Sequence, residues 1–474
     1  MELFSFIFTY FILIFTIIIC LSYLLLGLIS AYQLLHYKRA NSAVNYDILL
    51  SAPNAPSISI LAPAYNESKT IVDNVNALLS IHYNNFEVIV INDGSTDDSL
   101  SKLIQEYELK SIDFAVNSII PTKEIRAVYR SKNRAFRLLT VVDKYNGGKA
   151  DSLNAGLNIA QHDLFVAIDV DSVIEPDALL KMAKPFMENS DEQVIATGGA
   201  IRIANSCHIE NGHIVQVEVP KNLWARFQVV EYTRAFLMGR IAWSKLNGLL
   251  LISGALGLFD KQVAMACGGY NHNTVGEDME LVIRMRKYMY NKKIKHRVEY
   301  IPDPLCWTEV PDNLTMLHRQ RNRWTRGLMD SLHIHRKMFF NPTYGSLGML
   351  GYPFWFFFEW LAPIIEVLGL SYMVYLIIIG AVNWPFFLFL FLFVYLFAVA
   401  FSSYAILYEE YTFHKYRKVT DIIKLIAIAF IEPFSYHFIN VYNAIRGNIS
   451  FLLGNKTWGV QERKGFKSVP ETKK

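Results

Sequence analysis

The sequence predicts an α/β protein in which a mostly parallel sheet domain is inserted between N-terminal and C-terminal transmembrane helices. Three observations lead to this fold class. Long apolar segments lie near both ends of the 474 residues. Between them, short apolar runs alternate with helical stretches, which is typical of a parallel sheet covered by helices. The hydrophobic fraction of 52% is high for a soluble protein, and its excess is concentrated at the two ends.

The first apolar segment, residues 3–35, has no charged side chain. About 20 apolar residues span a bilayer, so we expect a transmembrane helix within residues 1–36. A signal peptide is the alternative, but this segment is far longer than a signal-peptide core and no small-residue cleavage site follows. Lys38 and Arg39 come after the helix, so the positive-inside rule predicts that the chain enters the cytoplasm at this point.

A linker over residues 37–56, which contains Pro53 and Pro56, leads into a predicted soluble domain over residues 57–340. Its last part, near residues 312–340, is expected to form helices at the membrane surface. Strands are expected where short apolar runs occur, at 57–62, 86–91, 138–142, 164–168 and 194–200.

Residues 349–445 are predicted to form transmembrane or interfacial helices. The segments 349–384 and 385–408 are expected to span the membrane as a pair. The segment 421–441 is interrupted by charges and a proline, and we expect it to be re-entrant or interfacial. The basic tail, residues 446–474, is then cytoplasmic.

Glu359, Glu366 and Glu432 lie at membrane depth in this prediction. A carboxylate there is costly unless it faces protein or water. Either these helices sit near the interface with their acids reaching the headgroups, or the acids line a polar path through the bilayer.

Charge and cysteine content exclude some classes. The net charge of +4 is small, which argues against nucleic-acid binding driven by bulk charge and leaves the basic residues to membrane topology or substrate phosphates. The cysteines have no metal-ligand spacing and suggest no disulfide framework, which fits a reducing cytosolic face. They are Cys20, Cys207, Cys267 and Cys306.

Asp169 and Asp171 come directly after the apolar strand 164–168. Ligands bind at the carboxyl ends of strands in open α/β sheets. Two carboxylates at that edge suit a hard divalent cation, magnesium or manganese, with substrate phosphates as further ligands. A solvated turn is the alternative for an isolated Asp-x-Asp pair.

Polar loops come after other predicted strands. The loop with Tyr65 and Glu67 and the turn with Asp93 could hold a base and a ribose. The Gly147-Gly148 pair with Lys149, at a helix start, suggests a pyrophosphate contact. Taken singly, each is also an ordinary turn or capped helix.

Two further groups suggest chemistry. Asp278, which comes after Glu277 at a helix start, could act as a general base, although helix capping is the alternative. In the stretch from Gln320 to Trp324, Arg323 could stabilise a diphosphate leaving group and Trp324 could stack on a sugar. An amphipathic helix on the membrane surface is the alternative for that stretch.

Together these groups, in this order between membrane helices, resemble the processive family-2 glycosyltransferases, which include the poly-N-acetylglucosamine, chitin-oligosaccharide, hyaluronan and cellulose synthases. The resemblance covers residues 50–340 strongly and the flanking helices loosely. It rests on Asp93, Asp169-x-Asp171, Glu277-Asp278 and Gln320-x-x-Arg323-Trp324. It implies a GT-A fold, a nucleotide-sugar donor and an inverting single displacement.

The resemblance also implies roles at the donor end of the site. Lys149 would contact the diphosphate, and Asp169 and Asp171 would bind the metal. Contacts with the nucleotide would come from Tyr65, Glu67, Asp93 and Asp169.

At the acceptor end, the resemblance implies that Asp278 is the base for the acceptor hydroxyl. Gln320, Arg323 and Trp324 would hold the diphosphate and the end of the growing chain. Two residues depart from the pattern: Asn92 replaces a frequent acid, and Gly276 stands where cellulose-type enzymes have Thr, which moves the prediction away from cellulose.

The expected function is therefore polymerisation of sugar from a UDP donor, with UDP-N-acetylglucosamine as the expected donor, into an extracellular or biofilm polysaccharide. The expected partners are the donor, the growing glycan and membrane lipids, with an export protein as a further option. Transfer of one sugar to a lipid acceptor is the alternative product. A membrane-anchored receptor with a degenerate nucleotide-binding domain is the non-enzymatic alternative.

Overall fold

The computed structural model describes residues 2–41, 44, 46, 50, 52, 55–169, 172–188, 190–210, 212–416 and 418–455. These residues fall into two compact units. The helical unit takes 2–40, 219–248 and 311–455, and the sheet unit takes 41–218 and 249–310. The predicted catalytic domain, 57–340, thus contributes residues to both units.

The sheet unit is built on a ten-stranded sheet with the order β3-β4-β5-β2-β1-β6-β11-β8-β12-β7. Pairing directions show that seven of these strands run the same way, with β4, β7 and β11 reversed. The mostly parallel sheet predicted from the sequence is therefore confirmed. The strands are β1 (Ile58–Ala64), β2 (Phe86–Asn92), β3 (Leu109–Ile112), β4 (Ile125–Ser131), β5 (Leu139–Lys144), β6 (Leu164–Ile168), β7 (Val173–Ile174), β8 (Gln193–Ile203), β11 (Leu256–Asp260) and β12 (His296–Thr308).

Helices cover both faces of this sheet. Gly156 of α5 lies against Leu61 of β1, whereas Thr197 of β8 donates to the Met182 carbonyl of α6. Strand register places Leu61 and Thr197 on opposite faces, because side chains alternate along each strand. The helices of this unit are α3 (Ile71–Leu79), α4 (Ser99–Glu106), α5 (Lys149–Ile159), α6 (Ala178–Met187), α9 (Lys261–Ala266) and α10 (Glu277–Asn291), with a 3-10 turn η1 (Arg134–Phe136).

The central strands are buried on both faces, as strands between two helical layers must be. Every residue of β6 is buried, and β1 is buried except at Pro63. A separate hairpin, β9 (His208–Glu210) and β10 (His213–Gln216), pairs outside the main sheet. The carboxyl ends of β1, β2, β5 and β6 lie at one sheet edge, and the predicted ligand-binding loops begin there.

The helical unit contains the long apolar helices. Three helices among the described residues are long and apolar enough to cross a membrane: Ser5–Asn41, Leu347–Ile378 and Trp384–Phe413. Its elements are α1 (Glu2–Asn41), α7 (Leu223–Thr233), η2 (Arg234–Arg240), α8 (Ile241–Lys245), α11 (Leu314–Ile334), η3 (Arg336–Met338), η4 (Pro342–Tyr344), η5 (Leu347–Gly351), α12 (Tyr352–Phe354), η6 (Trp355–Leu361), α13 (Ala362–Ile378), α14 (Trp384–Phe413), α15 (Val419–Ile431), η7 (Glu432–Phe434) and α16 (Tyr436–Leu452).

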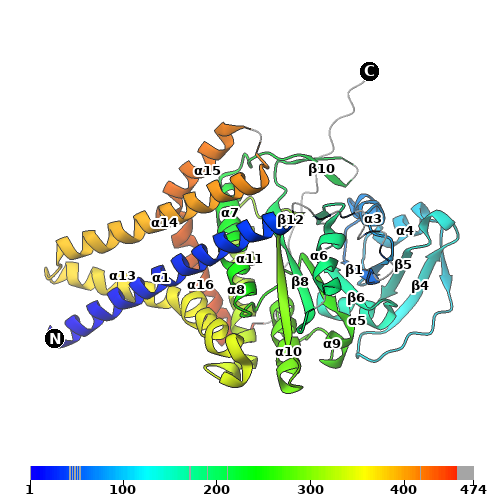
Figure 1. Cartoon of the computed structure of the whole chain (residues 1–474), viewed down its shortest axis with the longest axis horizontal. Coiled ribbons are helices and arrows are strands. Elements are labelled where there is room, and N and C mark those ends of the chain that lie inside the picture. The colour runs from blue at the N-terminus through cyan, green and yellow to red at the C-terminus, as the bar shows by residue number, and fades with distance from the viewer. Residues whose placement is uncertain are drawn as a thin grey trace. The chain divides into compact units, whose positions relative to one another are not determined.

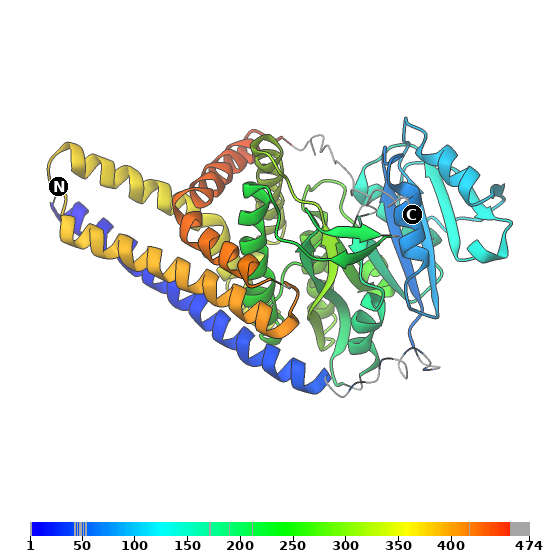
Figure 2. The same ribbon diagram turned by 90° about the horizontal axis from the view of Figure 1, so that it is seen from above.

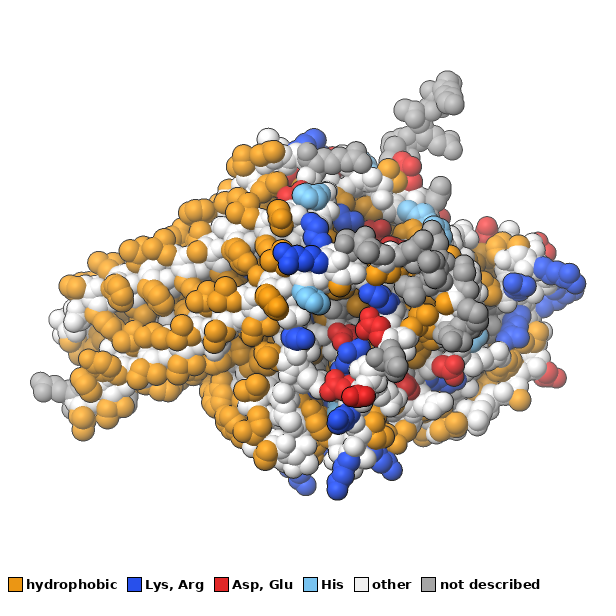
Figure 3. Space-filling model, viewed as in Figure 1, with side chains coloured by type: hydrophobic (Ala, Val, Ile, Leu, Met, Phe, Trp, Pro, Cys, Tyr) orange, Lys and Arg blue, Asp and Glu red, His pale blue; other side chains and the backbone are white. Residues whose placement is uncertain are grey.

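These membrane candidates pack on one another and expose apolar side chains outward. Helices α1 and α14 lie side by side in both ribbon views (Figures 1 and 2), and the Tyr408 hydroxyl of α14 donates to the Ala31 carbonyl of α1 at 2.6 Å. The Tyr372 hydroxyl of α13 donates to Ser5 of α1. Figure 3 shows a nearly continuous hydrophobic surface over these three helices. That surface suits lipid, which is the only solvent that does not penalise it.

The last apolar segment is bent by 50° at a break between η7 and α16. This geometry is that of a broken span or a re-entrant loop, so the predicted re-entrant or interfacial arrangement stays a prediction. The basic tail beyond residue 455 lies outside the described residues.

Each membrane-depth acid has a polar partner inside the helical unit. Glu359 accepts from the Tyr23 hydroxyl at 2.9 Å, and Glu366 lies 2.8 Å from His437. Glu432 accepts two hydrogen bonds from the guanidinium of Arg234, both at 2.5 Å. A hydrogen-bond partner lowers the cost of a carboxylate at membrane depth. Of the three acids only Glu432 is buried, whereas Glu359 is exposed.

Candidate active site

Asp169 stands at the carboxyl end of β6, as predicted, and faces a cation. The Lys149 ammonium, from the first turn of α5, donates to Asp169 Oδ1 at 2.5 Å. It also donates to the Gly254 carbonyl at 3.2 Å. The two residues come from neighbouring parts of the sheet edge, so the structure brings the predicted diphosphate lysine and the predicted metal carboxylate together.

Asp278 opens α10 and lies beside the same lysine. Its Oδ2 accepts from the Gly254 backbone N–H at 2.9 Å, and its Oδ1 accepts from the Met279 N–H at 2.8 Å. The capping alternative is therefore real, because the second bond is made to the helix's own first turn. It does not remove the chemical role, because each carboxylate oxygen keeps a further lone pair.

A small cavity of about 10 Å³ lies between these groups, which is room for roughly one water molecule. It is lined by polar groups and by the aromatic rings of Phe259 and Tyr270. The polar groups include Lys149, Ser253, Gly254, Glu277 and Asp278. A base candidate and an ammonium suited to phosphate thus share one cavity of the sheet unit.

Charge in this cavity alters two pKa values. Burial lowers the pKa of Lys149, but the carboxylates of Asp169 and Glu277 outweigh burial and raise that pKa above its usual value. Lys149 therefore stays protonated. Burial, reinforced by Glu277 and Asp278, raises the pKa of Tyr270 well above its usual value, so its hydroxyl also stays protonated.

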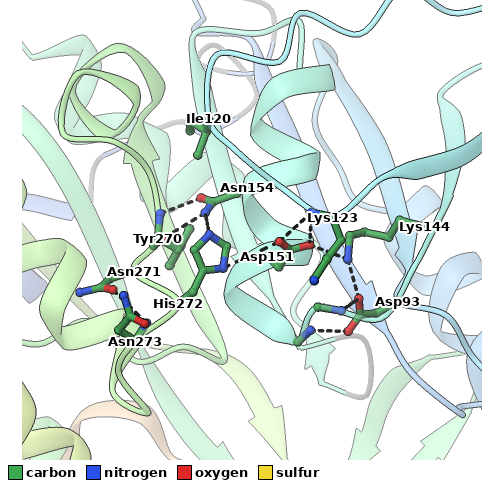
Figure 4. A network of polar contacts seen from close by, with 12 residues as sticks. Asp93, Ile120, Lys123, Lys144, Asp151, Asn154, Tyr270, Asn271, His272 and Asn273 are labelled. Atoms are coloured by element: carbon green, nitrogen blue, oxygen red, sulfur yellow. Dashed lines mark hydrogen bonds and ion pairs between the residues drawn. The ribbon is translucent and has the colours of Figure 1, made fainter.

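Asp93 is buried and organises the loop that precedes α5. Its Oδ1 accepts from the Lys144 ammonium at 2.7 Å and from Gly147 N–H at 2.9 Å, and its Oδ2 accepts from Gly148 N–H at 2.8 Å (Figure 4). The glycine amides expected to meet a pyrophosphate are thus bonded to Asp93. In this structure Asp93 positions that loop, while its contact with a nucleotide stays a prediction.

Tyr65 and Glu67 lie on a loop tied to the turn after β2. Asn66 has a left-handed backbone (φ 56°), and its Oδ1 accepts from the Thr96 N–H at 2.8 Å. The Ser99 hydroxyl accepts from Glu67 N–H at 3.0 Å. Tyr65 is 51% exposed. These loops hold one another, which leaves the Tyr65 ring free of the core and available to a ligand.

Gln320, Arg323 and Trp324 lie on α11 in the helical unit. Gln320 is buried, whereas the Trp324 indole is 42% exposed. The structure thus presents an indole face on α11, as the prediction of a sugar-stacking residue requires. The predicted approach of these side chains to Asp278 stays a prediction.

Arg321, to which the sequence analysis assigned no role, makes several contacts with other helices of this unit. Its guanidinium donates to both carboxylate oxygens of Glu231 on α7, at 2.8 and 2.6 Å, and to the Tyr436 hydroxyl at 2.8 Å. It also lies 4.3 Å from the centroid of the Trp324 ring. The role of Arg321 could not be predicted from a single sequence, because its partners, Glu231 and Tyr436, lie in distant segments of the chain.

A divalent cation is implied by the predicted carboxylate pair. Asp171 lies outside the described residues, and the described part of the chain holds no group of three or more His, Cys, Asp and Glu side chains close enough to bind a metal ion. Asp169 offers a carboxylate oxygen at the end of β6, where it forms an ion pair with the Lys149 ammonium. Hard oxygen donors at this edge suit magnesium or manganese.

The sequence of this chain is similar to those of known glycosyltransferases. Residues 55–327 match the model of the family described as "Glycosyltransferase like family 2". The poly-β-1,6-N-acetyl-D-glucosamine synthase of Staphylococcus epidermidis is 27% identical over 57% of this chain and 54% of its own length. The enzyme of the same name from Staphylococcus aureus is 29% identical over the same shares. The chain therefore spans about half the length of these curated relatives.

Among solved structures, a mannosyltransferase from Pyrobaculum calidifontis in complex with GDP-Man and Mn²⁺ has a similar fold. Its TM-score is 0.51 at 15% identity, and the match covers 92% of this chain and 99% of the other. That likeness supports the GT-A fold alone. The family match covers more than half of the chain and includes β1 to β12 and most of α11, so the chain belongs to glycosyltransferase family 2.

Proposed function

We propose that this protein is an inverting, metal-dependent glycosyltransferase that polymerises sugar from a UDP donor, with UDP-N-acetylglucosamine as the donor, at the cytoplasmic face of a membrane. The observation that carries this proposal is the cavity in which Asp278 and Lys149 meet, with Asp169 bonded to the same lysine. A base for a hydroxyl and a cation for a diphosphate are the two groups that sugar transfer from a nucleotide needs.

In this mechanism Asp278 accepts the proton of the acceptor hydroxyl as that oxygen attacks the anomeric carbon of the donor. The bond from the anomeric carbon to the diphosphate oxygen breaks, and UDP leaves with the electron pair. Attack opposite to the leaving group inverts the anomeric centre. Asp278 is suited to this task because Gly254 N–H and Met279 N–H fix its orientation.

The leaving diphosphate is stabilised by cationic side chains. Lys149 holds its proton and lies in the cavity, and Arg323 can form two parallel hydrogen bonds to phosphate oxygens. Asp169 and Asp171 would hold a magnesium or manganese ion, which when bound would neutralise part of the diphosphate charge. Tyr65 and Glu67 would contact the nucleotide base and ribose.

The acceptor end of the growing glycan would stack on Trp324, with Gln320 beside it. The half-exposed indole of Trp324, packed against the guanidinium of Arg321, supports this role. The apolar helices α1, α13 and α14 would anchor the enzyme and carry the product outward, alone or with an export partner. The names of the Staphylococcus relatives support a β-1,6-linked product of the kind found in biofilms.

The test is a donor screen with membranes that contain the full chain. Release of the nucleoside diphosphate (UDP or GDP) and polymer size are measured for UDP-N-acetylglucosamine, UDP-glucose and GDP-mannose, with and without Mn²⁺ after chelation. We expect UDP release and a ladder or smear of products with the first donor, lost on chelation. A single short glycolipid would instead support transfer of one sugar to a lipid. UDP binding without turnover would support the non-enzymatic alternative, a membrane-anchored nucleotide receptor.

A further inference from the structure

The segment between α9 and α10, residues 267–276, leads directly into Glu277 and Asp278. It forms no helix or strand of its own. Backbone bonds to α9 hold Cys267 to Gly269, and side chains from other elements hold the residues beyond them. Asn154 of α5 does so. Its Oδ1 accepts from the Tyr270 N–H at 2.7 Å, and its Nδ2 donates to the Tyr270 carbonyl at 2.9 Å (Figure 4). The amide thus copies the pairing of a neighbouring strand.

The oxygen and both N–H groups of the Asn154 amide face polar partners. Its second N–H faces His272 Nε2 at 3.1 Å, and the side chain is fully buried. The other ring nitrogen of His272, Nδ1, lies 3.8 Å from Asp151. Neither an alkyl side chain nor a carboxylate at position 154 could make this set of contacts.

Gly269, in the same segment, also lies close to Asn154. Gly269 has φ +68°, and a Cβ there would overlap Asn154 Oδ1. On the other side of the segment, Arg284 of α10 donates to the carbonyls of Cys267 at 2.5 Å and Gly269 at 2.6 Å. The segment is therefore bonded between α5 and the helix that begins with the Asp278 turn.

Helix α5 is itself fixed to the strands beneath the predicted nucleotide site. The Lys144 ammonium, fully buried, bridges Asp93 at 2.7 Å and Asp151 at 2.6 Å. The same helix carries Lys149, which reaches Asp169. One helix thus sets both the diphosphate lysine and, through Asn154 and Tyr270, the wall of the cavity that contains Asp278.

We propose that Asn154 is a positioning residue that sets where Asp278 stands relative to the donor, by holding the 267–276 segment against α5. This proposal rests on the proposed function, because it takes Asp278 as the base. Asn154 does not touch the reacting atoms. Its loss should therefore lower the rate of transfer while leaving the contacts that bind the donor in place.

The test compares Asn154→Ala and Asn154→Asp with Asn158→Ala in the full-length protein. Asn158 is a matched control, because it lies one turn later on α5 and makes the same paired contact with Ile120, at 3.1 Å to its N–H and 2.8 Å to its carbonyl. Ile120 approaches the 267–276 segment with its apolar side chain, whose Cδ1 lies near Gly269.

We expect kcat to fall about 10- to 100-fold in both Asn154 variants, because misplacement by about 1 Å costs that much. The KM for the UDP-sugar and the Kd for UDP should stay within about twofold of wild type, while Asn158→Ala keeps kcat within about threefold, because only Asn154 holds the base-bearing segment. Transfer should also fall more than donor hydrolysis, because only transfer needs the acceptor hydroxyl at Asp278.

Equal losses of kcat in the Asn154 and Asn158 variants would overturn the proposal. So would loss of UDP binding in every Asn154 variant, including the milder Asn154→Ser, since the role would then be structural. Failure of the proposed function gives a different result: full activity of Asp278→Asn, or no UDP release by the wild-type enzyme from any donor.

Discussion

Lys144 holds two buried carboxylates at once, and its own side chain is inaccessible to solvent. Removing one member of a buried ion pair leaves a charge without its partner and costs about 3–5 kcal/mol. Lys144→Met should therefore lower the free energy of unfolding by about that amount, measured as a large fall in the thermal midpoint of the solubilised protein. Lys102→Met, which removes an exposed pair with Asp98, should cost less than about 1 kcal/mol.

A nearly unchanged midpoint for Lys144→Met would show that Asp93 and Asp151 do not need this cation. The sequence prediction did place Asp93 at the right strand end. It could not find the buried lysine beside it, because the ion pairs of Lys144 with Asp93 and Asp151 form only when β2, β5 and α5 come together.

His296 gives the sheet unit a dependence on pH. Burial lowers the pKa of His296 to about 4, against the usual value of 6.5. The unfolded chain therefore binds a proton near pH 6.5, while the folded chain resists it until about pH 4. Stability is full above pH 6.5 and falls between these values, by about 3 kcal/mol in total.

The measurement is the thermal midpoint between pH 7 and pH 4.5 for wild type, His296→Phe and the exposed control His82→Phe. The His296 variant should show a shallower fall with decreasing pH than the other two proteins. Identical slopes in all three proteins would mean that folding does not lower the pKa of His296.

Helix α11 is held to two neighbouring helices by Arg321. Arg321 joins it to Glu231 of α7 and to Tyr436 of α16, and its guanidinium lies over the Trp324 ring. A lysine cannot reproduce two parallel bonds to a carboxylate. Arg321→Lys should therefore loosen Trp324 and shorten the products, with little change in UDP binding.

A double-mutant cycle checks this coupling. Arg321→Lys and Glu231→Gln remove the same interaction. The double variant should therefore lose about 1–3 kcal/mol less unfolding free energy than the sum of the two single losses. The effects of Arg321→Lys and of Asp191→Asn, which lies at an exposed turn, should be additive. Additive effects in the first pair would contradict the anchoring role.

The elements that the sequence predicted are those with a local signal. The apolar runs at 57–62, 86–91, 138–142, 164–168 and 194–200 became β1, β2, β5, β6 and β8. The remaining strands of the sheet were not predicted. Strand β12 contains two prolines and alternating polar residues, and β7 has two residues, so only pairing across distant segments defines them.

The same limit applied to the site. Asp169 and Asp278 were predicted from strand-end and helix-start positions, because such positions lie at a sheet edge in any α/β fold. Arg321 and the capture of Tyr270 by Asn154 depend on contacts between segments far apart in the chain, which a single sequence does not encode locally.

For the whole molecule, the predicted topology puts the sheet unit in the cytoplasm. Helices α13 and α14 would then meet outside, at residues 379–383. Ala381→Cys should react with a membrane-impermeant maleimide on intact cells, whereas Ser190→Cys in the sheet unit should react only after permeabilisation. The reverse labelling pattern would show that the topology is opposite to the predicted one. Labelling of both sites on intact cells would also contradict the prediction.

The most direct measurement of the central claim is sugar transfer by Asp278→Asn beside Asp191→Asn, which makes the same chemical change at an exposed turn of the sheet unit. Labelled UDP-N-acetylglucosamine is supplied to membranes, and incorporation into polymer and binding of UDP are both recorded. The account predicts that Asp278→Asn abolishes incorporation with UDP binding retained, while Asp191→Asn keeps wild-type incorporation. Wild-type incorporation by Asp278→Asn would contradict it.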